Sequence, residues 1–378
     1  MKYNLNDKPG IFPMFMYGLQ WWIVSIPCVV IMGIIVAQLH STDASGQIFY
    51  MQKLFGVMGI AMTAQVLWGH RLPIIIGPAS VLLIGILAAI SMGTAAIYTA
   101  IFVCGIFVAL LAFCGLLSHL QAIFTPRIII VILCLIAFTL APVILQLIFT
   151  NTGSASFQLF FALLLAFGMI LANRLLRGIW KSTVVLCGIL AGSFIYYSIE
   201  GFPLLPSLIP LPAAETHFWL WPLHFDGGVI LSFFFCFIAL IVNELGSIQA
   251  VGQMIGADNM EKRTTRGVGF IGLSNILSGI CGIIGPVDYS MSPGIIAATG
   301  CASRYTLIPA GLGLVICAFF PGFIQILNCI PGVVMGSVLL YLMSSQLSAG
   351  LQMLSRSKAV FDFNSGIIIG FPLMVALM

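Results

Sequence analysis

Long apolar runs, separated by short polar stretches, dominate the chain. Most of these runs approach the about 20 residues that a helix needs to cross a bilayer. The pattern therefore predicts an all-α polytopic membrane protein. Its expected spans cover residues 15–38, 53–69, 72–90, 95–117, 128–149, 155–173, 182–198, 226–248, 267–284, 286–302, 306–327 and 331–349, and a thirteenth begins near Gly366.

Two of these runs, the third and the tenth, are interrupted by helix-breaking and polar residues. The tetrapeptide Ile-Ile-Gly-Pro occurs at Ile75–Pro78 and again at Ile283–Pro286, and polar residues follow it. Lipid cannot hydrogen-bond free backbone groups, so such segments must be buried in protein or face a watery cavity. Broken helices in corresponding halves are typical of transporter binding sites. A short outer loop between two ordinary spans is the alternative.

We expect residues 78–81 and 287–291 to be extended and near each other, with a helix starting after each. The polar side chains of these segments are candidates for ligand contact, namely Ser80, Asp288, Tyr289, Ser290 and Ser292. If spans 1–7 and 8–14 form two repeats, span 3 corresponds to span 10, and the odd number inverts the second repeat. The last run has only about 13 residues, too few to cross a bilayer. We therefore expect a 14-span plan truncated in span 13.

Composition supports this class and excludes others. Hydrophobic residues make up 61% of the chain and charged residues 6%, with a mean hydropathy of +1.17, whereas soluble domains carry about 25% charged residues. The net charge of +4 comes from basic residues scattered over loops, which argues against nucleic-acid binding. The ten cysteines lie singly in or beside apolar runs, as small lipid-facing or core residues do.

The basic residues predict an orientation. With a cytoplasmic N-terminus, Lys53 is the only one of the 14 Lys and Arg residues on the outer side, as the positive-inside rule requires. The loops at 118–127, 174–181 and 257–266 are then cytoplasmic, and the proline-rich loop 199–225 is outside. No eukaryotic targeting segment is visible, so we expect the inner (plasma) membrane of a bacterium.

The tenth span resembles that of the nucleobase–ascorbate transporters, also called the second nucleobase–cation symporter family, which includes uracil and xanthine permeases. The family signature is an acid or Gln, then Asn, any residue, Gly, four residues, Thr, and Arg, Lys or Gly. Gly294, Thr299 and Gly300 match it, whereas Met291 and Ser292 do not. The resemblance covers nearly the whole chain, with further matches at Leu19–Gln20, Leu72–Pro73, Gly77, Glu244–Gly246 and Ile330–Tyr341.

The resemblance implies two inverted seven-span repeats, with short strands in spans 3 and 10 that pair at mid-membrane. A core domain would contain residues 1–117 and 226–327, and a gate domain residues 118–198 and 328–378, with the outer loop 199–225 between the halves. The implied function is secondary active uptake of a nucleobase such as uracil or xanthine by an elevator-like movement of core against gate. Coupling would be to protons or sodium, without a cofactor, and a homodimer is compatible with it.

Two carboxylates are candidates for proton coupling. The family's acid in span 8 corresponds to Asn243, with Glu244 beside it. Asn243 can hydrogen-bond a base without titrating, whereas Glu244 can carry a proton. An acid buried in a span is a functional-site hypothesis by default, and a structural hydrogen bond is the alternative for Glu244. Asp288 lies three residues before Met291, the family's second acid position, and either replaces that acid or faces the outer vestibule.

Four further residues complete the candidate site. Gln20 and Thr299 are lining candidates, although a helix-packing role suits both. Tyr341 is expected to cap the site from the gate side. Met291 occupies a family binding position with a side chain that cannot hydrogen-bond usefully.

Two rival classes remain. An anion transporter of the sulfate-permease type shares the inverted plan and would hold its anion at helix N-termini, but Glu244 and Asp288 would repel an anion. An enzyme has less support, because Asp288 lacks a second acid for a dyad and no metal-ligand spacing occurs. The histidines all lie at span ends or in loops, namely His40, His70, His119, His217 and His224. We therefore expect a transporter without a metal and without enzymatic activity.

The orientation can be tested with single cysteines placed in the predicted loops on a cysteine-free background. Because charge places the basic loops inside, a membrane-impermeant thiol reagent should label intact cells only at cysteines in 199–225. Cysteines in 257–266 should react only after the membrane is opened. Labelling of 257–266 in intact cells would contradict the orientation.

Overall fold

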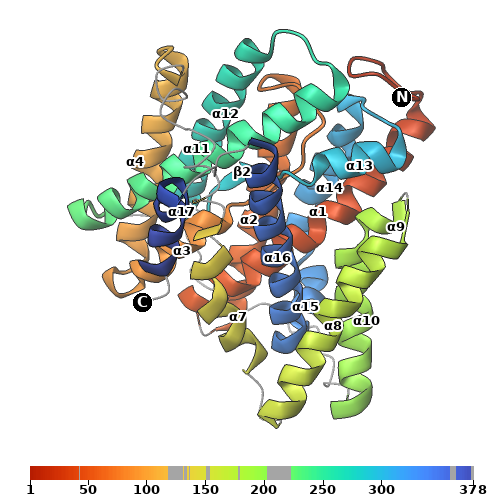
Figure 1. Ribbon diagram of the computed structural model, residues 1–378, viewed down its shortest axis with the longest axis vertical. Coiled ribbons are helices and arrows are strands. Elements are labelled where there is room, and N and C mark those ends of the chain that lie inside the picture. Colours follow the sequence, from red (N-terminus) through yellow and green to blue (C-terminus); the bar gives the residue numbers. More distant parts are fainter. Residues whose placement is uncertain are drawn as a thin grey trace. The chain divides into compact units, whose positions relative to one another are not determined.

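The computed structural model describes residues 1–41, 43–117, 131, 134–135, 137–149, 154–177, 179–201, 223–357 and 363–375. It is mostly helical, and Figure 1 follows the course of the chain. In chain order its main elements are α1 (Ile11–His40), α2 (Ala44–Leu67), β1 (Ile76–Pro78), α3 (Ser80–Ala88), α4 (Thr94–Phe113), α7 (Ala141–Ile148), α8 (Ala155–Leu175), α9 (Ile179–Ser182), α10 (Val184–Glu200), α11 (Gly227–Ile255), α12 (Met260–Cys281), β2 (Pro286–Asp288), α13 (Ser292–Thr299), α14 (Leu307–Ala318), α15 (Pro321–Asn328), α16 (Gly332–Ser357) and α17 (Phe363–Val375), with short 3-10 turns at Ile90–Met92 and Arg304–Thr306.

The chain divides into two compact units. The first contains Met1–Leu117, Arg177–Leu186 and Leu204–Cys329, and the second contains Ser118–Leu176, Cys187–Pro203 and Ile330–Met378. Both strands therefore belong to the first unit, together with α1 to α4 and α11 to α15.

Glycines bring the helices of the first unit close together. A Cβ on Gly272 of α12 would lie 2.5 Å from the backbone nitrogen of Ala109 on α4. Gly59 of α2 faces the carbonyl of Gly311 on α14 in the same way. Lipid gives no hydrophobic drive for helix association, so close backbone packing of this kind holds membrane helices together.

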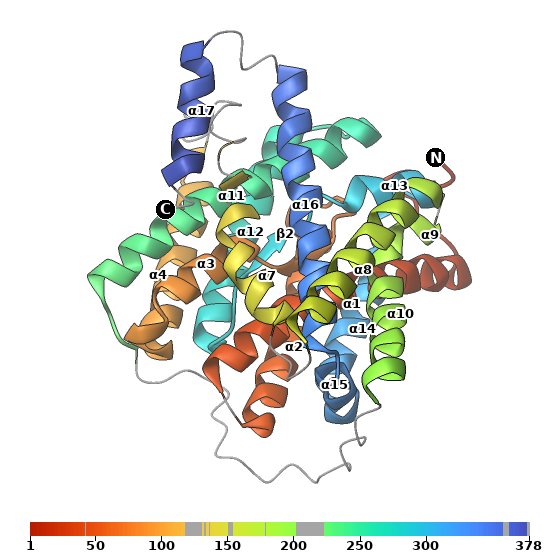
Figure 2. The same cartoon turned by 60° about the horizontal axis from the view of Figure 1, so that its bottom comes forward.

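The two interrupted segments form a small antiparallel sheet inside the first unit. In Figures 1 and 2, β2 lies next to α11 and α12, enclosed by helices. Helix α3 begins two residues after β1, and α13 begins four residues after β2. The strands lie slightly earlier than the predicted 78–81 and 287–291, since Ser80 is already helical. The paired residues are Ile76 with Asp288, Gly77 with Val287, and Pro78 with Pro286.

Two helices begin earlier than the apolar pattern predicts, because polar residues continue them. Helix α2 begins at Ala44 rather than near residue 53, and the Asp43 carboxylate caps it by accepting the Gly46 N–H, a typical N-cap contact. Helix α12 begins at Met260 rather than near residue 267, so most of the predicted loop 257–266 is helical.

The predicted eleventh span, 306–327, is bent rather than continuous. Helix α14 ends at Ala318 and α15 begins at Pro321, with an angle of 88° between the two helical pieces. Proline lacks a backbone N–H and is tolerated in the first turn of a helix but not in its interior. Pro321 is therefore suited to begin a new helix and not to continue the old one.

Lys53, the exception to the charge pattern, has a structural role. Its Nζ donates to the carbonyl of Cys281 at 2.6 Å, and it lies 5.1 Å from the centre of the Phe49 ring. Cys281 is the last residue of α12, where a cation complements the negative end of the helix dipole. Capping of α12 is therefore a structural reason for Lys53, the basic residue that the predicted orientation leaves on the outer side.

Helices of the second unit also pack through glycines. A Cβ on Gly192 of α10 would lie 2.6 Å from Leu165 of α8 and 3.3 Å from Val334 of α16. Gly336 of α16 faces the carbonyl of Ile144 on α7, 3.1 Å from a Cβ position. Figure 2 shows α7, α8 and α16 running next to one another.

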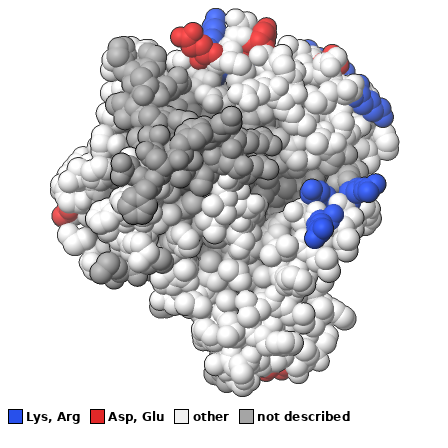
Figure 3. Space-filling model, viewed as in Figure 1, with Lys and Arg blue, Asp and Glu red and all other residues white. Residues whose placement is uncertain are grey.

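Four of the described helices, α1, α4, α8 and α11, are by themselves long and apolar enough to cross a bilayer, and the bent pair would make a fifth. The predicted number of crossings stays a prediction. Phe160, Leu164 and Phe167 form an exposed apolar stripe on α8, at the spacing of one helix face. The face in Figure 3 carries few charged side chains, gathered in small groups. Residues 118–127 and 202–222, from two predicted loops, lie outside the described residues.

Candidate functional site

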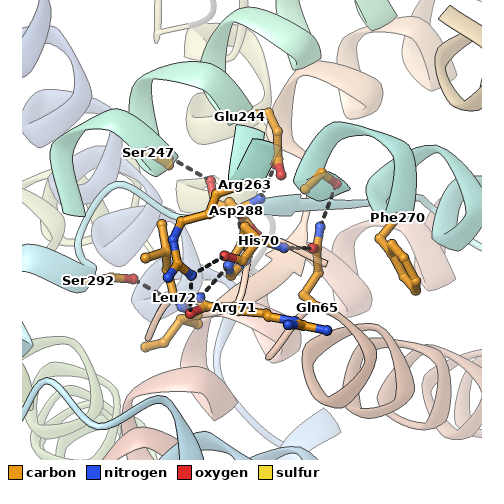
Figure 4. A network of polar contacts seen from close by, with 12 residues as sticks. Gln65, His70, Arg71, Leu72, Glu244, Ser247, Arg263, Phe270, Asp288 and Ser292 are labelled. Atoms are coloured by element: carbon orange, nitrogen blue, oxygen red, sulfur yellow. Dashed lines mark hydrogen bonds and ion pairs between the residues drawn. The ribbon is translucent and has the colours of Figure 1, made fainter. Parts of the chain in front are cut away.

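One turn of α11 holds the end of strand β2 (Figure 4). The carbonyl of Asp288 accepts hydrogen bonds from Asn243 Nδ2 at 3.4 Å and Ser247 Oγ at 3.0 Å. The N–H of Asp288 donates to Glu244 Oε2 at 3.0 Å. Backbone groups at this depth have no water to bond to, so the α11 side chains supply the partners where the β1 pairing ends.

The side chain of Asp288 faces His70, in the segment between α2 and β1. Asp288 Oδ2 lies 3.2 Å from His70 Nε2, and both side chains are fully buried. The two groups are at ion-pair distance but are not aligned as a hydrogen bond. Within the described part of the chain, Nε2 and both Asp288 carboxyl oxygens have no hydrogen-bond partner. An acid and a histidine therefore lie next to each other beside the strands, and part of the hydrogen-bonding capacity of each side chain remains unused among the described residues.

The tautomer of His70 follows from its second nitrogen. Leu72 donates its backbone N–H to His70 Nδ1 at 2.8 Å. That nitrogen must therefore carry a lone pair, and the proton of the neutral imidazole belongs on Nε2, the atom that faces Asp288. Protonating Nδ1 would set two N–H groups against each other.

The backbone of His70 is also held from two helices. Gln65 Oε1 accepts its N–H at 3.2 Å, while Gln65 Nε2 donates to the Gly267 carbonyl on α12. Arg263 Nη1 donates to the carbonyls of His70 and Arg71 at 3.1 and 3.2 Å. Arg71 has a left-handed φ of 58°, which is uncommon for a side chain other than glycine. These contacts fix a sharp turn that presents His70 to the strands.

Arg263 connects this turn to the surface. Its Nη2 forms an ion pair with Asp258 Oδ1 at 3.0 Å. Asp258 is mostly exposed, and hydrogen bonding to Arg263 holds the pKa of its carboxyl below its usual range. The guanidinium is therefore committed to three carbonyls, those of His70, Arg71 and Asp258, and to the Asp258 carboxylate.

Ser292 and Tyr289 bind β1 from the α13 side. Ser292 Oγ accepts the N–H of Ile75 at 3.0 Å and donates to the Tyr289 carbonyl at 2.9 Å. Tyr289 donates its hydroxyl to the Pro78 carbonyl at 2.7 Å, and its ring lies so close to Gly77 that a Cβ there would be 2.8 Å from ring carbons. Gly77 thus allows a flat aromatic ring to lie against the strand.

Asn275 of α12 supports the other edge of β2. Its Nδ2 donates to the carbonyls of Ile271 and Pro286 at 2.8 and 3.1 Å. The amide oxygen lies against Gly285, where no Cβ would fit. The repeated Gly-Pro pair therefore places a glycine at a close approach within β1, at Gly77, and directly before β2, at Gly285.

Exposure separates the polar residues into two groups. Glu244, Asp288 and Ser292 are buried, whereas Asn243 and Ser80 are half-buried and Ser290 is exposed. The second group, beside the N-terminus of α3, keeps exposed surface, whereas at the start of α13 the N–H groups of Ser292 and Gly294 are bonded to the carbonyls of Tyr289 and Met291. Free N–H groups at helix N-termini favour electron-rich oxygens. Such a surface can bind a planar molecule that carries both hydrogen-bond donors and acceptors.

The structure brings most of the predicted site residues together. Asn243, Glu244 and Ser292 all bond to the strands or to the turn beside them, as described above. Thr299 donates to the Ile295 carbonyl of its own helix at 2.8 Å, which is a local role. Met291 is the cap residue of α13 and makes no side-chain cap bond. Gln20 lies on α1 and Tyr341 on α16 of the second unit, and their roles stay predictions.

Sequence reasoning missed His70 and Ser247. The apolar pattern places His70 at the end of a span, and no sequence pattern pairs it with Asp288. The available signal was its position just before Leu72–Pro73, at the entry to a broken span. Ser247 lies three residues after Glu244, on the same helix face. Among the described residues, no group of three His, Cys, Asp or Glu side chains is arranged to hold a metal ion.

Comparisons with known proteins agree with the sequence pattern. The model of a permease family, Xan_ur_permease, matches residues 12–378. The nucleobase transporter PlUacP of Paenibacillus larvae is 27% identical over 352 residues, 89% of this chain and 80% of its own length. A Clostridium perfringens relative is 27% identical over 249 residues, which is 64% of this chain and 54% of that relative.

The fold is similar to that of solved membrane transporters. The transmembrane domain of a cyanobacterial bicarbonate transporter, BicA, superposes with a TM-score of 0.66 at 15% identity, over 96% of this chain and 94% of that domain. At this identity the likeness concerns the fold.

Ser290 and Ser292, both in the tenth predicted span, provide a matched pair of variants that tests the site. Ser292→Ala leaves the buried N–H of Ile75 without its partner, which should cost about 1–3 kcal/mol of stability. Ser290→Ala, two residues away and exposed, should change little. We expect a lower midpoint of thermal unfolding in detergent for Ser292→Ala only. Equal midpoints for the two variants would contradict the role given to Ser292.

Proposed function

The chain belongs to the Xan_ur_permease family of permeases, and we propose that it is a secondary active transporter that takes a nucleobase into the cell. The substrate class is uracil, xanthine or a related purine. The observation that carries the proposal is the β1–β2 pair, with a helix starting after each strand and α11 closing the end of β2. Broken helices of this kind surround the substrate site of many transporters.

The proposed site suits a flat heterocycle. The ring amides of a nucleobase offer alternating N–H and C=O groups, which complement strand backbone and helix N-termini. Half-buried Asn243 would donate to and accept from the base, and Ser80, Ser290 and the backbone around Met291 would line its edge. The Tyr289 ring, held by its bond to Pro78, offers an apolar face. Gln20 and Tyr341 complete the proposed lining.

We propose that coupling is to protons and involves Glu244 and Asp288. Both are fully buried. Burying an ionisable group in a span costs free energy, which makes such a residue a candidate for function. Glu244 accepts the backbone N–H of Asp288 on strand β2, so protonation of Glu244 would change a hydrogen bond at the proposed site. Coupling to sodium is the alternative for the same acids.

Transport is proposed to follow an elevator-like movement of a core against a gate, within a 14-span plan of two inverted repeats. The repeated Ile-Ile-Gly-Pro at the two strands supports the repeat. The two compact units support the division into core 1–117 with 226–327 and gate 118–198 with 328–378, except that residues 177–186 group with the first unit. The proposed location is the plasma (inner) membrane, with a cytoplasmic N-terminus, as a monomer or homodimer.

An anion transporter is the second candidate, because the fold is similar to that of a bicarbonate transporter. Paired helix N-termini attract anions. Against it, Glu244 and Asp288 place two acids beside the strands, and Arg263, which holds the neighbouring turn, is committed to carbonyls and to Asp258. An anion would therefore meet repulsion that a neutral base does not.

An uptake panel separates the two functions. Cells that express the protein should accumulate labelled uracil or xanthine, and unlabelled base should compete, because the site offers paired donors and acceptors. Sulfate and bicarbonate should neither compete nor be taken up. Saturable sulfate or bicarbonate flux without competition by any base would replace the nucleobase proposal with the anion one.

The coupling role is tested by Glu244→Gln. Glutamine retains the volume and an acceptor for the Asp288 N–H but cannot titrate. Exchange of base across the membrane should persist, whereas accumulation against a gradient should be lost. The matched control is Glu261→Gln, at an exposed position in the first turn of α12, which should transport normally. Normal accumulation by Glu244→Gln would remove Glu244 from the coupling mechanism. Asn243→Ala, in contrast, should weaken binding at every pH.

A further inference from the structure

Three ionisable groups lie close together in the buried region beside the strands. The charge on each therefore affects the free energy of charging the other two. Glu244 and Asp288 interact electrostatically, and His70 Nε2 lies 3.2 Å from Asp288. Two carboxylates without a cation would be strongly unfavourable in a dry interior. Arg263 does not neutralise them, since its donors go to the carbonyls of His70 and Arg71 and to Asp258.

His70 is built to act as a neutral donor rather than as a cation. Becoming an imidazolium requires a proton on Nδ1, and that atom accepts the N–H of Leu72. Gln65 and Arg263 hold the backbone of His70 in place, and the Leu72 N–H holds its ring at Nδ1. The remaining N–H is on Nε2, which lies 3.2 Å from Asp288 Oδ2, at ion-pair distance but not aligned as a hydrogen bond.

The two acids therefore have different surroundings. Asp288 has the Nε2–H of His70 at its Oδ2. Glu244 has the Asp288 N–H at Oε2, while its Oε1 has no partner within the described part of the chain. Neighbouring carboxyls in unlike environments divide into one that stays ionised and one that takes the proton.

We propose that His70 is a positioning residue for proton coupling: as a neutral Nε2–H donor it keeps the negative charge on Asp288, so that the transported proton is carried on Glu244. The inference rests on the proposed function and deepens it. The step is protonation of the Glu244 carboxylate at Oε1 from one side of the membrane and release of the same proton to the other. No other bond changes.

The groups that face this pair are few. Helix α11 contributes Glu244 and α12 contributes Arg263, while α2 approaches with the uncharged Gln65. Strand β1 and helices α3 and α13 contain no ionisable side chain. Figure 4 shows Glu244 and His70 on different sides of Asp288. His70 and Glu244 also interact electrostatically with each other when the imidazole is charged. As a neutral ring, His70 acts on Glu244 through the charge of Asp288.

The experiment follows the protonated carboxyl directly, by the infrared carbonyl band of the purified full-length protein across a pH series. Glu244→Gln should abolish the titrating band, and Asp288→Asn should retain it. His70→Leu removes the donor, so Asp288 loses its charge. Glu244 then loses a negative neighbour, and the midpoint of the band should fall by about one pH unit or more, the usual effect of a nearby like charge.

Three comparisons distinguish a positioning role from a merely structural one. His70→Gln keeps a side-chain N–H donor and should titrate nearly as the wild type does. The double variant His70→Leu with Asp288→Asn should show no larger shift than Asp288→Asn alone, because both changes remove the same charge. The exposed His224→Leu, the control, should leave the midpoint in place.

The inference is overturned if the band disappears in Asp288→Asn instead of Glu244→Gln, or if His70→Leu titrates like the wild type. Should His70→Leu fail to fold, an unshifted band in Asp288→Asn overturns it equally. Base uptake is measured in the same variants. Bands that shift as expected in a protein that takes up no base would reject the proposed function and leave the His70 assignment standing.

Discussion

Everything near the candidate site depends on one constraint, which is that backbone groups within a membrane must find partners inside the protein. Two helices of the first unit are broken at Gly-Pro pairs, and the freed backbone is satisfied by strand pairing between β1 and β2. Where that pairing ends, side chains complete it. Asn243, Glu244 and Ser247 bond to Asp288, and Ser292 bonds to Ile75.

The same constraint explains why the ionisable residues are where they are. Glu244 accepts a backbone N–H, and Asp288 is the residue that provides it. Neither acid is an isolated charge, and each is connected to the strand geometry. In the proposed coupling, protonation of Glu244 would change this backbone hydrogen bond.

Much of this architecture could be predicted from the sequence, for identifiable reasons. Apolar runs as long as a bilayer is thick indicate helices directly. The first Ile-Ile-Gly-Pro contains β1, and the second ends at Pro286, the first residue of β2. Helix ends were less predictable, because polar first turns such as that of α12 continue a helix without continuing its apolar pattern. The bend at Pro321 was not placed, since a proline in an apolar run permits both a kink and a fresh helix start.

The site was predictable only in part. Residues within the broken segments could be listed, since their polarity stands out against apolar neighbours. For His70 the only signal is its position just before Leu72–Pro73, because its partner Asp288 is more than 200 residues away. The exposure of each side chain could not be predicted either. Which of the neighbours Asn243 and Glu244 is half-buried and which is fully buried depends on how α11 packs.

The long separation between the strands also has a consequence for how the protein is made. Pro78 and Tyr289, which are hydrogen-bonded, are 211 residues apart. At synthesis rates of about 5–20 residues per second, the second strand follows the first by roughly 10–40 s. During that interval the first broken helix enters the membrane without the partner that satisfies its backbone. Until the second half is made, the backbone groups of the first strand therefore need other hydrogen-bond partners, from the insertion machinery or from water.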